Sequence, residues 1–174
     1  MARVWRAFAR ALAALNLWMG YAAGLLVAIS ALVLTAEVLL RYFLGSPSDW
    51  ALELCITMLI ASTFVSAAYT LAARGHVNID IVDALLSAGV NRWRLLFADA
   101  ASAGLCGFVA ANAWRLTATA WREGWVSNST WGPKLWVPFA FIALGMSLLA
   151  LQYLVQIVDE RVAPMLQRGR HGRA

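Results

Sequence analysis

Three ionisable side chains, Glu37, Arg41 and Glu53, lie within 17 residues of one another in the sequence. Glu37 and Arg41 are four residues apart, so on a helix they lie one turn apart in the order that favours an ion pair. Glu53 follows after a short segment that contains a proline, and its carboxylate is also within possible reach of Arg41. We expect structural ion pairing among these three groups, with gating or contact with a partner protein as the alternative.

Residues that commonly bind metals or carry catalysis are scarce elsewhere. The chain has two histidines, His76 and His171, and two cysteines, Cys55 and Cys106, with no C-x-x-C spacing. Zinc sites and thiol oxidoreductases need clustered ligands or thiols, and a haem held by two histidines needs both within the helices. We therefore predict no catalytic, cofactor-binding or metal-binding residues, and no enzymatic activity.

The amino-acid composition is typical of a membrane protein. Hydrophobic residues make up 62% of the 174 residues and charged residues 13%, against roughly 25% charged in typical globular proteins. A chain of this length cannot hide so much apolar surface in its own interior, so the lipid bilayer is its first expected partner. The net charge of +5 comes from dispersed single residues, so nucleic acid is not expected as a partner.

Four uncharged runs indicate helices that cross the membrane. They cover residues 11–36, 54–73, 100–114 and 135–158, and all but the third reach about 30 Å as helix. We predict an all-α membrane protein with four transmembrane helices at about residues 11–40, 50–73, 95–120 and 134–158, forming a single domain over residues 1–160. The first run exceeds the apolar region of a signal peptide and is expected to remain as an anchor. Small-residue stripes at Gly20-x-x-x-Gly24-x-x-x-Ala28 and Ala103-x-x-x-Gly107 are expected to pack within the chain, with packing against a partner as the alternative.

The segment between the second and third helices has its own periodicity. Polar residues recur at steps of three and four within residues 78–93, and apolar residues fill the other side. This pattern predicts an amphipathic interfacial helix that lies on the membrane surface. It acts either as a connector or as a docking element for another membrane subunit. Residues 161–174 form a basic tail, predicted to be cytoplasmic, to which we assign no role.

Charge and tryptophan are distributed unequally between the two membrane faces. With both termini in the cytoplasm, ten of the fourteen Lys and Arg residues lie inside, which predicts an N-in, C-in topology. Most tryptophans then lie at the outer face, where an aromatic belt explains them. Trp125 lies in the outer loop near Arg122, however, and this combination also suits a recognition surface. Trp136, at the start of the fourth helix, is a further candidate contact or anchor.

Several strings along the chain coincide with one known family. They are Arg41-Tyr42, Trp50 with Glu53, the string Arg74-Gly75-His76-Val77-Asn78-Ile79-Asp80, and Pro133-x-x-Trp136 followed by Gly145 and Gln152. Together they resemble the small (Q-type, DctQ-like) membrane subunit of tripartite ATP-independent periplasmic (TRAP) transporters. The resemblance extends from about residue 18 to residue 156. It makes Arg74, His76 and Asp80 further candidate partner-contact or structural residues.

The resemblance implies an auxiliary subunit of a solute importer in the bacterial inner membrane. Such a subunit is a scaffold beside a large TRAP membrane subunit, which holds the substrate and ion sites. A periplasmic substrate-binding protein delivers the substrate, usually an organic anion such as a carboxylate, and an ion gradient drives import. Two alternatives stay open: a membrane-anchor subunit of a respiratory or redox complex, and a self-sufficient small four-helix transporter.

The charge asymmetry leads to a test of topology. A cysteine introduced by Ser127→Cys should react with a membrane-impermeant maleimide in intact spheroplasts, and one introduced by Gly169→Cys should react only after lysis. The parent chain, whose two cysteines lie within apolar runs, sets the background. Labelling in the opposite pattern would reverse the orientation and the assignment of every loop.

Overall fold

The computed structural model describes residues 2–45, 48–73 and 88–158 of the chain. Within these residues it contains the helices α1 (Ala2–Leu44), α2 (Asp49–Ala72), α4 (Ala88–Glu123) and α5 (Trp136–Gln156). Each helix includes a stretch that is long and apolar enough to span a membrane. The prediction of an all-α protein with four membrane-spanning helices is therefore confirmed.

α1 is longer at both ends than the predicted residues 11–40. No proline interrupts the sequence before Pro47, and the helix ends at Gly45, whose φ is 62°. The N–H of Gly45 donates to the carbonyl oxygen of Arg41 at 3.1 Å, which closes the helix in a left-handed C-terminal turn. A helix of 43 residues measures about 64 Å, against about 45 Å for a bilayer with its headgroups. α1 must therefore tilt strongly or extend beyond the membrane surface.

The predicted interfacial helix at residues 78–93 is corrected for the part that the structure describes. Residues 88–93 belong to α4, which was expected to begin near residue 95, so they continue the spanning helix and do not form a separate surface element. Arg94 donates from Nε to Asn91 Oδ1 at 3.0 Å, one turn away, which supports an unbroken helix at this point. Residues 78–87 and the basic tail at residues 161–174 lie outside the described residues.

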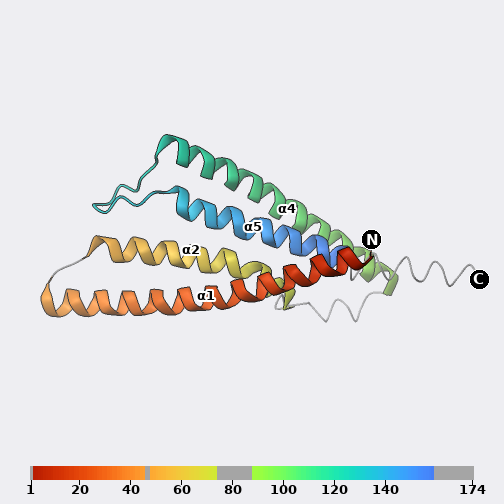
Figure 1. Ribbon diagram of the computed structural model, residues 1–174, viewed down its shortest axis with the longest axis horizontal. Coiled ribbons are helices and arrows are strands. Elements are labelled where there is room, and N and C mark those ends of the chain that lie inside the picture. Colours follow the sequence, from red (N-terminus) through yellow and green to blue (C-terminus); the bar gives the residue numbers. More distant parts are fainter. Residues whose placement is uncertain (1, 46–47, 74–87, 159–174) are drawn as a thin grey trace, which may run out of the picture.

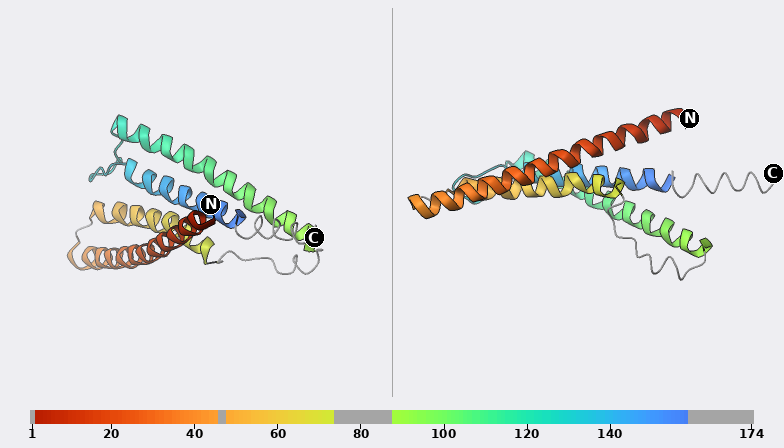
Figure 2. Two further views of the ribbon diagram at one scale, coloured as in Figure 1. Left: turned by 45° about the vertical axis from the view of Figure 1, so that its right-hand side comes forward. Right: turned by 90° about the horizontal axis from the view of Figure 1, so that it is seen from below.

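The four helices lie side by side in the order α1, α2, α5, α4 (Figure 1). α2 and α5 occupy the inner positions, and α1 and α4 form the two edges. Seen from below, the N-terminal halves of α1 and α4 diverge toward opposite sides (Figure 2). This open row leaves large apolar side chains exposed on every helix, as lipid-facing surfaces require, among them Leu25, Leu52, Phe108 and Leu154.

The closest helix contacts form where a glycine replaces a side chain. A Cβ atom on Gly145 of α5 would lie 2.2 Å from the carbonyl oxygen of Phe64 of α2. A Cβ on Gly20 of α1 would lie 2.7 Å from the ring of Tyr69 of α2. Gly20 therefore packs within the chain as expected. Gly24 of the same stripe and Gly107 of the second stripe do not pack against another helix, because a Cβ on either would meet open space.

The contact at Gly145 predicts a large effect for a single methyl group. Gly145→Ala should force α2 and α5 apart and lower the free energy of unfolding by about 1–3 kcal/mol. The measurement is thermal or denaturant unfolding in detergent micelles, followed by circular dichroism. Gly107→Ala is the control and should be neutral or slightly stabilising, because alanine favours helix more than glycine does. Equal stability of the two variants would contradict this packing.

Candidate functional site

Five of the eight candidate residues from the sequence lie at one end of the molecule. We call this the hairpin end; it comprises residues 37–53, where α1 meets α2, and residues 121–136, where α4 meets α5, at the left of Figure 1. The five residues there are Arg41, Glu53, Arg122, Trp125 and Trp136. The other three, Arg74, His76 and Asp80, lie outside the described residues.

Glu37 organises the junction between α1 and α2. Its side chain is only 7% exposed, and its carboxylate accepts a hydrogen bond from Arg41 Nη2 at 3.0 Å, so the expected ion pair is present. The same carboxylate accepts bonds from the Ser48 backbone N–H at 2.9 Å and from the Ser48 hydroxyl. Ser48 is the N-cap of α2; its hydroxyl makes no capping bond to the helix and donates instead to Glu37. Glu37 thus joins the end of one helix to the start of the next.

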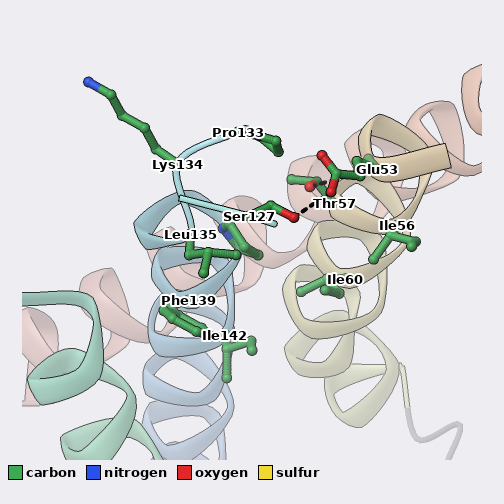
Figure 3. A pocket seen from close by; sticks show the side chains of 11 residues that line it. Glu53, Ile56, Thr57, Ile60, Ser127, Pro133, Lys134, Leu135, Phe139 and Ile142 are labelled. Carbon is green, nitrogen blue, oxygen red and sulfur yellow. Dashed lines mark hydrogen bonds between the residues drawn. The ribbon is translucent and has the colours of Figure 1, made fainter. Parts of the chain in front are cut away.

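Glu53 has a different partner from the one considered in the sequence. Its Oε1 accepts a hydrogen bond from the hydroxyl of Ser127 in the α4–α5 loop, and Figure 3 shows the two side chains directed toward each other. Arg41 pairs with Glu37, and its side chain is 60% exposed. The interpretation that Glu53 also reaches Arg41 is therefore wrong. A four-residue spacing identifies the first pair, whereas Ser127 is 74 residues away in sequence and no local pattern indicates it.

The loop between α4 and α5 has a defined hydrogen-bonded shape. α4 ends at Gly124, whose φ is 66°, and the N–H of Trp125 returns to the carbonyl of Ala120 at 3.0 Å, the bond that closes a Schellman motif. The loop then folds back on itself through an antiparallel bridge between Val126 and Lys134. The N–H of Ser127 donates to Pro133 at 3.0 Å and so fixes the residue that binds Glu53.

Three of the five tryptophans of the hairpin end have defined contacts. Trp121 and Trp136 pack edge to face with ring centroids 4.6 Å apart, which joins the end of α4 to the start of α5. Trp136 therefore has an intramolecular contact. Trp125 is 36% exposed, and its indole N–H donates to Glu123 at 2.7 Å. That bond holds the Trp125 ring on the surface of the loop, and Arg122 beside it is exposed.

Two further polar contacts lie deeper in the row of helices. Asn16 of α1 is fully buried and donates from Nδ2 to Gln152 Oε1 of α5 at 2.9 Å. Trp114 of α4 donates to the Ser147 hydroxyl of α5 at 3.2 Å. Asn16 was not singled out from the sequence; its only signal was an amide within an apolar run. These are helix-to-helix hydrogen bonds of the kind that membrane proteins use for packing.

The arrangement is therefore suited to holding helices and loops together. The carboxylates of Glu37 and Glu53 bind serines and an arginine. Among the described residues no group of three His, Cys, Asp or Glu side chains could hold a metal ion. With four helices able to span a bilayer, the fold and these contacts define a multi-pass membrane protein.

Comparison with known proteins identifies its family. The model of the DctQ component of tripartite ATP-independent periplasmic transporters matches residues 30–162, most of the chain. The protein belongs to this family of transporter components, and the resemblance seen in the sequence strings is confirmed. Its class is that of a small TRAP permease subunit. Neither a curated protein nor a solved structure gives a significant match.

The Glu37 junction predicts a local stability effect. Glu37→Ala removes the acceptor for Arg41, for the Ser48 N–H and for the Ser48 hydroxyl, and should lower the free energy of unfolding by about 1–3 kcal/mol. Unfolding in micelles measures the change. The matched control is Glu123→Ala, which removes one exposed hydrogen bond and should change stability by less than about 0.5 kcal/mol. A Glu37→Ala protein as stable as the control would show that the junction forms without this carboxylate.

Proposed function

We propose that this chain is the scaffold subunit of a TRAP importer in the bacterial inner membrane. It packs beside the large membrane subunit, and the complex imports an organic anion, of the carboxylate class, that a periplasmic binding protein delivers. An ion gradient drives the import. The family match over residues 30–162 carries this proposal. Both termini lie in the cytoplasm, so the hairpin end faces the periplasm.

The packing of the helices supports a static role. Several specific contacts hold the helices together: the close approach at Gly145 and the direct hydrogen bonds of Asn16 with Gln152 and of Trp114 with Ser147. A subunit that carries substrate across the membrane needs polar groups along a path and contacts that exchange. This chain instead offers two exposed apolar edges, α1 and α4, that a larger membrane protein can cover.

The α4–α5 loop is the proposed docking surface for the binding protein. Trp125 presents a partly exposed ring that its bond to Glu123 holds in place, and exposed Arg122 adds charge nearby. A held aromatic side chain loses little conformational freedom on binding, which suits a contact residue. The inner string with Arg74, His76 and Asp80 is proposed, from the sequence, as a contact with the large subunit.

Reconstitution tests the proposed function. The chain should co-purify in mild detergent with a polytopic protein more than twice its size, and proteoliposomes should take up substrate only when both membrane subunits and the binding protein are present. Uptake by this chain alone would instead make it a small transporter. A Soret band in the purified protein would instead make it a redox anchor.

Docking at the loop predicts a selective loss for one tryptophan. Trp125→Ala should weaken productive docking about 30-fold, since a central interface tryptophan contributes about 2 kcal/mol or more. The measurement is initial uptake in proteoliposomes against the concentration of binding protein. Trp50→Ala, which removes an exposed tryptophan of α2 at the same end, is the control and should leave the curve unchanged. A Trp125→Ala curve that overlays wild type would leave the loop as a membrane anchor only.

A further inference from the structure

A cavity of about 270 Å³ lies at the hairpin end between α2, α5 and the α4–α5 loop (Figure 3). Its lower wall is apolar and comes from facing positions on α2 and α5, namely Ile56, Ile60, Pro138, Phe139 and Ile142. Its upper end holds the polar side chains of Glu53, Thr57 and Ser127; Lys134 also contributes to the lining, but its side chain points away from the cavity (Figure 3). The cavity thus has one polar end and one apolar end.

The polar end is short of a hydrogen-bond donor. Glu53 Oε1 accepts from the Ser127 hydroxyl, and the Thr57 hydroxyl donates to the backbone carbonyl of Glu53 at 3.0 Å. Glu53 Oε2 is buried, and none of the described residues donates to it. A buried carboxylate oxygen without a donor is costly, so a group that fills this cavity should bring an N–H or O–H. A cation satisfies the charge as well.

The polar end of the cavity lies nearer to the end of the membrane-spanning segment than the apolar end does. Glu53 lies in the second turn of α2, close to the end of its spanning segment, and Ile60 lies about 10 Å further along the helix. One turn beyond Ile60, α2 and α5 come into close contact at Phe64 and Gly145. A polar end at headgroup level above an apolar slot of this kind fits an amphiphile.

We propose that this cavity binds a phospholipid whose headgroup carries a primary ammonium. The ammonium donates to Glu53 Oε2, and the phosphate lies at the open upper end of the cavity. One acyl chain follows the apolar wall formed by α2 and α5. A trimethylated ammonium has no N–H to donate, and an anionic headgroup is repelled by the carboxylate, so the site discriminates among headgroups.

Lipid binding to the purified full chain tests the proposal. Native mass spectrometry in mild detergent compares phosphatidylethanolamine, phosphatidylcholine and phosphatidylglycerol with identical acyl chains. Wild-type protein should hold phosphatidylethanolamine about tenfold more tightly than either of the others. Equal binding of the three lipids by wild type would overturn the proposal, whatever the variants do.

Two variants separate the headgroup contact from the chain contact. Glu53→Gln should abolish the preference for phosphatidylethanolamine, whereas Glu123→Gln, the same change outside the cavity, should keep it. Ile142→Trp should fill the slot and lower binding of all three lipids at least fivefold, whereas Leu105→Trp, on the exposed face of α4, should not. A preference that survives Glu53→Gln would overturn the proposal. Co-purification with the large subunit is the second measurement. If Glu53→Gln lost the large subunit whichever lipid was present, a side chain of that subunit would fill the cavity, and the proposal would again be overturned.

Discussion

The contact between Gly145 and the backbone of Phe64 is the constraint on which the arrangement of helices depends. α1 and α2 form one antiparallel hairpin, α4 and α5 form the other, and α2 and α5 join them along a single seam (Figure 1). Between helices in lipid there is little hydrophobic driving force, because the tails are as apolar as the side chains. Association then relies on close van der Waals contact, which the missing side chain of Gly145 allows.

Two further hydrogen bonds join the two hairpins, one near each end of this seam. The Ser127 hydroxyl bonds Glu53 at the hairpin end, and Asn16 bonds Gln152 toward the other end, where α1 crosses to reach α5. A single seam would let one hairpin rotate against the other. Contacts at different positions along the helices resist that rotation. The Glu37 junction keeps α1 aligned with α2, so that Asn16 lies opposite Gln152. The result is a row of helices fixed by few but well-separated contacts.

The sequence predicts local features of this protein better than contacts between distant segments. Uncharged runs identify the four helices, and the four-residue spacing identifies Glu37 with Arg41. The partner of Glu53 depends on how a loop 74 residues away folds back, so it requires the structure. The sequence predicts helix ends less well where charged residues lie within a helix. Charged residues mark the membrane boundary, whereas helical hydrogen bonding can continue past them, as at the start of α4. The glycine stripes likewise show where close approach is possible, and only the order of the helices decides which glycines use it.

The seam is tight at Gly145 and opens within one helical turn toward the hairpin end. Packing alone therefore does not fix the upper part of α2 against α5; the loop residue Ser127 and whatever fills the cavity must do so. The proposed scaffold role requires that part to be rigid, because it lies next to the loop that carries Trp125. A lipid held between Glu53 and the apolar wall would extend the seam to the surface of the membrane. The membrane would then supply the packing that the chain itself leaves open, and the rigidity of the α4–α5 loop would depend on the headgroup composition of the leaflet around it.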